Sequence, residues 1–320
     1  MFQTNVKSNS QHPKSIAMKS SKLNLQLSIT ALLFMIAVML FSCQKDNSAP
    51  AAPVSEEEAV TMSQENAEAD AQYEDVSEIG FSADADVDVS ADANVEIPGS
   101  PNGGGLGAGV RVFANLEFKI GPCTKITVTP NDSTYPKTVV IDYGDGCVCR
   151  DGKFRKGAIV LHYTKPIRRP GAVLTITFRN YFVNRIHIEG TKIIKNLTIG
   201  TTHKFSVEVN DGKVTWPSGR GFKYEKMKVV TQVRGMETRT VRDDVYSIEG
   251  RSKTTYANGT TVNLNTETPL IKPVECNWIV KGILKIKIND RVLFLDFGNG
   301  DCDNKATLKV GERVLDIVLR

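Results

Sequence analysis

The sequence is poor in the residues and motifs that most often carry chemistry. Among 320 residues there are four histidines, and none stands at metal-ligand spacing from another histidine or a cysteine. The chain has no Gly-x-Ser-x-Gly elbow, no Ser/His/Asp set and no His-Glu-x-x-His motif. The glycine-rich run 103–109 is not a phosphate loop, because no Lys-Ser or Lys-Thr pair follows it. We therefore expect no enzymatic activity, no catalytic residue, no metal site and no cofactor.

Long apolar runs are also scarce, and the one that is present lies near the start of the chain. Residues 27–41 are apolar except for Ser28 and Thr30, and lysines precede them. A basic segment followed by about 15 apolar residues is typical of a signal peptide, because a membrane-spanning helix needs about 20. The run ends at Ser42-Cys43, which resembles a lipobox, although Phe41 departs from its usual small residue. We predict a lipoprotein signal peptide over residues 1–42 and a lipid, palmitate included, on Cys43; the alternative is an uncleaved anchor with an incidental cysteine.

The residues after Cys43 indicate where in the cell envelope the protein is expected to lie. Gln44-Lys45-Asp46-Asn47 resembles the short tag that sends lipoproteins of the Bacteroidota to the outer face of the cell. We expect an outer-membrane lipoprotein that is exposed at the cell surface. A polar tether on a periplasm-facing lipoprotein is the alternative.

Charge divides the mature chain into two unlike segments. Residues 44–109 carry one lysine against fifteen acids, whereas residues 110–320 carry 35 Lys and Arg against 21 acids. The first segment is rich in small and polar residues, so 43–109 is predicted to be a disordered acidic tether, Gly/Pro-rich at its end. Within it, Tyr73, Val76 and Ile79 recur every third residue, which leaves room for a short helix.

From Val110 onward, apolar and polar residues alternate. Examples are Leu174–Arg179, Phe205–Val209 and Leu284–Ile288. Alternation with a period of two is typical of antiparallel strands that bury one face. Residues 110–320 are therefore predicted to form a basic, all-β body of hairpin-rich antiparallel sheets, arranged as a sandwich or an elongated meander. Predicted turns lie at Asp151-Gly152, Asn210-Asp211-Gly212, Asn258-Gly259 and Asn289-Asp290.

Two segments of the body, near 123–164 and 276–320, look like copies of one unit. In each, a cysteine precedes an Asp-aromatic-Gly-Asp/Asn-Gly turn by 19 or 20 residues, and a second cysteine follows the turn. Exported cysteines are usually oxidised. The repeat predicts the disulfides Cys276–Cys302 and Cys123–Cys147, with Cys149 left over or in the place of Cys147. Metal binding by Cys147 and Cys149 is the alternative.

The acids of these turns and the basic body suggest ligands. Hard oxygen ligands at alternate positions can bind Ca²⁺, although Asp, Asn and Gly also favour turns for local reasons. A basic body can hold a polyanion, and Trp216, Tyr224 and Tyr246 would add stacking. An exported protein without a nucleic-acid-binding signature is not expected to bind nucleic acid. Lipopolysaccharide, an acidic glycan or the chain's own acidic leader are the better partners.

Several passages resemble a family of uncharacterised Bacteroidota surface lipoproteins. They are Phe178–Asn184, Ile188–Thr191, Asp244–Gly250, Cys276–Val280 and the most specific, Leu295-Asp-Phe-Gly-Asn-Gly-Asp-Cys-Asp-Asn-Lys-Ala306. The family supplies no activity, and Cys149 departs from its pattern, which marks that cysteine as the odd one. A weaker likeness joins Asp142–Gly146 and Pro170–Thr177 to the polycystic-kidney-disease domain, an Ig-like sandwich.

Together these patterns predict a lipid-anchored envelope protein that acts as a non-catalytic surface binding or structural module, with a glycan or envelope polyanion as ligand. One alternative is a glycan-active hydrolase whose acids meet only in the fold. Another is an accessory subunit of an outer-membrane complex.

Overall fold

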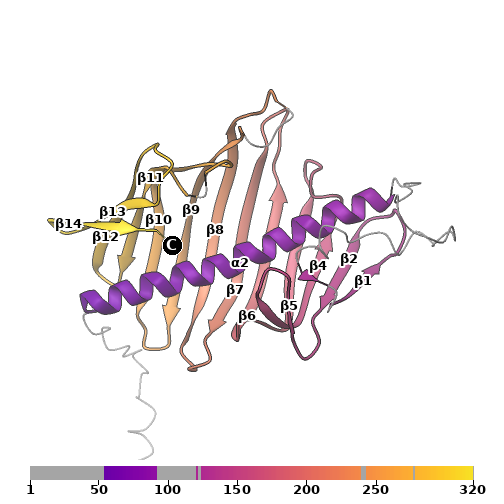
Figure 1. Cartoon of the computed structure of the whole chain (residues 1–320), viewed down its shortest axis with the longest axis horizontal. Coiled ribbons are helices and arrows are strands. Elements are labelled where there is room, and N and C mark those ends of the chain that lie inside the picture. The colour runs from indigo at the N-terminus through magenta and orange to yellow at the C-terminus, as the bar shows by residue number, and fades with distance from the viewer. Residues whose placement is uncertain (1–53, 92–119, 122–123, 239–242, 277, 320) are drawn as a thin grey trace, which may run out of the picture. The chain divides into compact units, whose positions relative to one another are not determined.

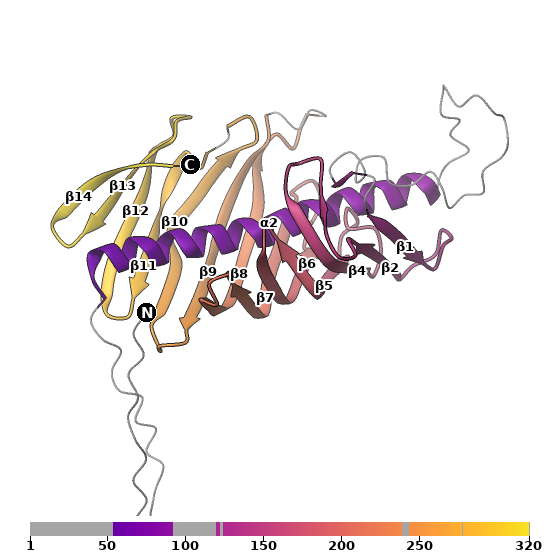
Figure 2. The same ribbon diagram turned by 60° about the horizontal axis from the view of Figure 1, so that its bottom comes forward.

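The computed structural model describes residues 54–91, 120–121, 124–238, 243–276 and 278–319. These residues belong to one compact unit, which is built from a single antiparallel sheet and one long helix (Figures 1 and 2). The predicted signal peptide, Cys43 and residues 92–119 lie outside the described part of the chain. No helix in the described part is both long and apolar enough to cross a membrane.

The sheet is an open meander of fourteen strands. Each strand pairs with its neighbours in the chain, except that the two-residue β3 stands beside β4 outside the main order. The strands are β1 (Lys125–Thr129), β2 (Lys137–Asp142), β3 (Cys147–Val148), β4 (Phe154–Tyr163), β5 (Val173–Val183), β6 (Ile186–Asn196), β7 (Lys204–Thr215), β8 (Gly221–Arg234), β9 (Val245–Tyr256), β10 (Thr261–Pro273), β11 (Lys281–Ile288), β12 (Arg291–Asn299), β13 (Lys305–Val310) and β14 (Arg313–Val318).

The prediction of an all-β, antiparallel, hairpin-rich body is confirmed, in its meander form. The likeness to an Ig-like sandwich is wrong, because β2, β4 and β5 continue into one sheet and do not form a second layer.

Three predicted turns connect strands as expected, but Asn210-Asp211-Gly212 lies inside β7. There the chain forms a bulge, with Asp211 at φ 51°, and the strand continues in the same direction.

The two repeat units have the same local structure. In the first, the carboxylate of Asp142 accepts the backbone N–H of Gly144 at 2.8 Å, and β2 then pairs with β4. In the second, Asp296 accepts the N–H of Gly298 at 2.9 Å, and β12 then pairs with β13. Both glycines have positive φ, which few other residues adopt without strain. The repeat is therefore a hairpin unit used near each end of the sheet.

The helix, α2 (Glu56–Ala91), corrects the prediction of a tether. It begins with a capping box: the Ser55 hydroxyl accepts the N–H of Glu58, and the Glu58 carboxylate accepts the N–H of Ser55. Its backbone remains helical through residues 83–91, where the sequence predicted disorder. The predicted short helix within residues 55–79 is thus the first part of a 36-residue helix.

The face that α2 turns to the sheet is built mostly from small side chains. Buried residues recur at steps of three or four, which is the spacing of one helix face. They are Ala59, Met62, Asn66, Ala69, Tyr73, Val76, Ile79 and Ala83. Short side chains let the helix lie close to the strands: a Cβ at Gly80 would stand 2.8 Å from Cδ2 of Leu174.

The helix crosses the strands from the β11 side toward the β1 side of the sheet (Figure 1). Along this path Asn66 bonds to Thr254 on β9, and the hydroxyl of Tyr73 donates to the carbonyl of Glu189 on β6 at 2.7 Å. Farther on, the hydroxyl of Tyr163 on β4 donates to the carbonyl of Gly80 at 2.7 Å. The main hydrophobic core lies between this helix and the strands, and a smaller apolar cluster around Leu270, Phe297 and Ala306 lies beside it.

Candidate functional site

The described residues include four of the six cysteines. Cys276 and Cys302 form a disulfide with Cα atoms 5.7 Å apart, as predicted. Cys147 is also disulfide-bonded, but its predicted partner Cys123 lies outside the described residues. Cys149 is free and buried, which agrees with its treatment as the odd cysteine and not with a metal site shared with Cys147.

The histidines and the acidic turns form no common site in the described residues. His162 is exposed on β4 beside the hydroxyl of Thr138, and His187 stacks on Phe182 with ring centroids 4.3 Å apart. Within the described ranges no group of three or more His, Cys, Asp or Glu is arranged to hold a metal ion. The carboxylates of Asp142 and Asp296 instead accept backbone N–H groups of their own turns.

Basic side chains of the sheet form ion pairs with acidic side chains of α2, which belongs to the acidic segment of the chain. Lys153 and Arg155 contact Asp75, and Arg220 contacts Glu65 at 2.9 Å. Of the partners that the sequence suggested for the basic body, its own leader is therefore one that the fold brings together. The other basic side chains that pair with α2 are Lys192, Lys226 and Lys228.

These last three lysines surround Asp70 and Glu74 of α2 and form a charged cluster. Lys228 lies 2.9 Å and Lys192 3.4 Å from the Glu74 carboxylate, and Lys226 bonds to Asp70. Burial raises the pKa of both carboxyls, but the nearby ammonium groups lower each pKa by more, so both remain charged. Burial lowers the pKa of Lys192 to about 8. The cluster thus holds three ammonium groups against two carboxylates, with the Lys192 side chain fully buried.

Two of the aromatic residues proposed for stacking on a ligand instead contact α2. The indole N–H of Trp216 donates to Glu68 at 2.9 Å, and the ring of Trp216 packs against Phe222. The hydroxyl of Tyr224 donates to Asp70 at 2.9 Å, and its ring stacks on Tyr73. The third, Tyr246, donates to Asp244 at 3.1 Å. The ring of Tyr224 is buried, which corrects the prediction for that residue. Trp216 and Tyr246 are only half-buried, so their stacking on a ligand stays a prediction.

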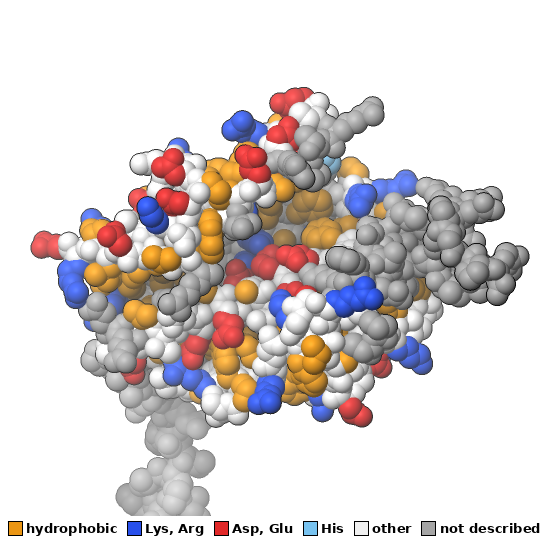
Figure 3. All heavy atoms as spheres, viewed as in Figure 1, with side chains coloured by type: hydrophobic (Ala, Val, Ile, Leu, Met, Phe, Trp, Pro, Cys, Tyr) orange, Lys and Arg blue, Asp and Glu red, His pale blue; other side chains and the backbone are white. Residues whose placement is uncertain are grey.

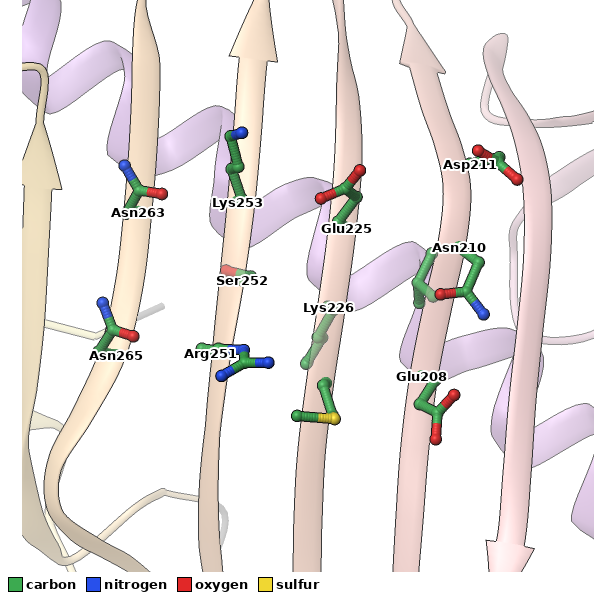
Figure 4. A pocket seen from close by; sticks show the side chains of 12 residues that line it. Glu208, Asn210, Asp211, Glu225, Lys226, Arg251, Ser252, Lys253, Asn263 and Asn265 are labelled. Carbon is green, nitrogen blue, oxygen red and sulfur yellow. The ribbon is translucent and has the colours of Figure 1, made fainter.

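The opposite, helix-free face of the sheet carries a polar trough of about 570 Å³ (Figure 4). Residues alternate between the two faces along each strand, so Tyr224 and Lys226 contact α2 while Glu225 and Met227 face the trough. The side chains that line the trough come from β7–β10: Glu208, Asn210, Asp211, Glu225, Met227, Arg251, Lys253, Asn263 and Asn265.

Strand pairing aligns these side chains in two rows. In the first row, Glu208 of β7 stands opposite Met227 of β8, which stands opposite Arg251 of β9 and then Asn265 of β10. In the second, Glu225 stands opposite Lys253, which stands opposite Asn263. Neighbouring strands are about 4.8 Å apart, so the first row spans roughly 14 Å. The bulge of β7 places Asp211 at the rim.

The trough offers both donors and acceptors on one surface. Each asparagine amide can donate and accept, Arg251 and Lys253 only donate, and the three carboxylates only accept. Acids and bases are mixed, so the surface is not a strongly positive patch. Sequence reasoning missed this site because a row across strands is visible only when the pairing register is known.

No family model, curated protein or solved structure matches the chain.

Proposed function

We propose that this protein is a lipid-anchored, non-catalytic binding module of the cell envelope, whose helix-free sheet face binds a glycan. The observation that carries the proposal is the pair of rows in the trough, where carboxylate, basic and amide side chains stand side by side, over roughly 14 Å in the longer row. Sugar hydroxyls both donate and accept, and so match amide, guanidinium and carboxylate side chains. Met227, with 41% of its surface exposed, adds an apolar contact between Glu208 and Arg251.

Between the two ligand classes suggested by the sequence, the trough favours a glycan of low charge over a polyanion. Three carboxylates, those of Glu208, Asp211 and Glu225, would repel a polyanion from this surface. Several of the body's basic side chains are meanwhile bound to α2. Binding should therefore depend weakly on salt, because few exposed charge pairs form.

The anchor and the surface location rest on the sequence signals around Cys43 and on the resemblance to surface lipoproteins. Twelve residues separate Cys43 from the start of α2 at Glu56. Such a segment spans at most about 40 Å, so an acylated Cys43 would keep the folded body close to the bilayer.

The test is binding of the protein to an array of envelope and extracellular glycans, followed by titration of the best ligand. Arg251→Ala and Asn265→Ala should each weaken binding about tenfold, because each removes hydrogen bonds from the first row. Lys309→Ala is the matched control, since Lys309 is exposed on β13, away from the trough. Equal binding by all three variants, or no glycan bound at all, would remove the proposal.

The three carboxylates of the trough are also the groups that the hydrolase alternative would use, and that alternative can be tested. Glycan hydrolysis uses a pair of carboxyl groups on either side of the scissile bond. The same glycans should be recovered uncleaved after long incubation with the protein. Cleavage that is lost in Glu225→Gln would establish the hydrolase instead.

A further inference from the structure

A second hollow lies on the other face of the sheet, beside α2. It has a volume of about 340 Å³ and is bounded by Asp70 of the helix and by strands β8–β12. Figure 3 shows this side of the molecule, where acidic, basic and apolar side chains meet around the hollowed surface beside α2. Small-molecule sites usually have volumes of this size, with mainly apolar walls and a few placed polar groups.

One end of the hollow is apolar. Its walls are formed by Ile248, Leu264, Leu270, Leu284 and Phe297. Leu270 and Phe297 belong to the small apolar cluster that lies beside the core under α2. If a methylene takes about the volume of a water molecule, roughly 30 Å³, this space accepts an alkyl chain of about ten carbons.

The β8 end is cationic, and Lys272 of β10 is a further basic residue in the lining. Lys226 and Lys228 line the hollow, and their side chains are only 10% and 14% exposed. They belong to the cluster in which three ammonium groups face the carboxylates of Asp70 and Glu74. Burial and the neighbouring Lys226 lower the pKa of Lys228. The three ammonium groups exceed the two carboxylates by one positive charge. An anion at this end would balance the cluster.

We propose that the hollow binds a single-chain anionic amphiphile, with its alkyl chain against Leu264, Leu284 and Phe297 and its anionic head group at Lys226 and Lys228. A fatty acid and a lysophospholipid share this chemistry. The hollow and the glycan trough share Lys226, Arg251 and Ser252 among their lining residues, but they open on opposite faces of the sheet. Lys228 lines only this hollow, whereas Glu225 and Met227 line only the trough. The two proposals therefore stand or fall separately.

The binding experiment uses residues 44–320, which include the whole compact unit from Pro50 and omit the predicted signal peptide and Cys43. Displacement of a fluorescent undecanoate measures the affinity of each competitor below its micelle concentration. The competitors are dodecanoate, lauroyl lysophosphatidylglycerol and neutral dodecanol. Saturable binding is expected for the two anions, with the tighter one identifying the source of the head group. Within the series hexanoate, octanoate and decanoate, each added methylene should raise affinity about fourfold.

Variants locate the site. Lys228→Met should weaken dodecanoate binding at least tenfold and keep the chain-length dependence, because it removes a cation and keeps the apolar wall. Leu284→Asn should reduce the chain-length dependence instead. Lys223→Met is the matched control and should bind as the parent does, since Lys223 is exposed on β8, the strand of Lys228, and lines neither hollow. Circular dichroism and Tm identify any variant that fails to fold.

Two results would overturn the proposal. One is the absence of saturable binding by either anion. The other is binding that is unchanged in Lys228→Met and equally tight for dodecanol, because the lysines would then have no part in recognition.

Discussion

Arg155 of β4 donates from its guanidinium to the carboxylate of Asp75, 80 residues earlier on α2, at 2.6 Å. The same guanidinium makes two hydrogen bonds to Asp151, at 2.9 and 2.7 Å. The Arg155 side chain is fully buried, and that of Asp75 is 5% exposed. Such a pair fixes where the helix lies, because either charge would be costly to leave buried alone.

Substitution of this pair should therefore destabilise the protein strongly. Asp75→Ala leaves a buried guanidinium with one carboxylate partner fewer, and the free energy of unfolding should fall by about 3 kcal/mol. Urea unfolding followed by circular dichroism measures the change. Gln64→Ala, at an exposed position of the same helix, should change stability by less than about 0.5 kcal/mol. Similar losses in both variants would mean that the Arg155 pair does not anchor α2.

Acid should loosen the helix from the sheet. Burial raises the pKa of Asp75, but Arg155 and Lys153 together lower it by more, so the folded-state pKa lies below the unfolded value. The unfolded state then binds more protons, and the stabilisation that is complete above about pH 5 is lost as the pH falls through the folded pKa. Tm should drop between pH 5 and pH 2, with a smaller drop in Asp75→Asn. An identical pH dependence in that variant would assign the effect to other groups.

Alkaline pH should have the opposite effect through Lys192. Burial lowers its pKa to about 8 in the folded state, whereas an unfolded lysine titrates near 10.4. Between these values the unfolded state binds more protons, so stability should rise with pH. Comparison of the wild type with Lys192→Met by urea unfolding at pH 7.5 and pH 9.5 isolates this contribution. A Met variant with the same gain in stability would contradict the assignment.

Chemical mapping should separate the disulfide-bonded cysteines from the free thiol of Cys149. Peptide mapping without reduction is expected to find Cys276–Cys302 and Cys123–Cys147, and iodoacetamide should reach Cys149 only after unfolding, because that thiol is buried. Joint replacement of Cys276 and Cys302 by serine should cost about 3–4 kcal/mol of stability in the chain-entropy model. A Cys123–Cys149 bridge in the map would reverse the predicted pairing.

The lipid anchor has its own test. Cys43→Ser should abolish incorporation of labelled palmitate and release the protein from the membrane fraction, and protease added to intact cells should digest the parent protein if it is surface-exposed. Cys149→Ser provides the control for loss of a thiol. Palmitate found on the Cys43→Ser variant would refute the anchor, and full protection of the parent protein from protease would refute the surface location.

Period-two alternation was enough to predict the sheet, and the repeated Asp-aromatic-Gly turn was enough to predict one disulfide. The helix was harder to predict, since half of the residues on its buried face, Ala59, Ala69, Ala83 and the polar Asn66, add little to a hydrophobic pattern. Its other support comes from charges such as Arg155 and Lys228 that lie far away in the chain. The Ser55-x-x-Glu58 capping box was the available local signal for its start.

The contacts between the first turns of α2 and the late strands also set an order of events in folding. Asn66 meets Thr254 across 188 residues, and Glu65 meets Tyr256 across 191. A helix made first can therefore dock fully only when nearly the entire polypeptide has emerged. Such distant contacts raise the contact order, and high contact order slows folding. Until the helix docks, the strands would expose their apolar face. A chaperone that binds unfolded chains would be most useful during that interval, because it would cover this face.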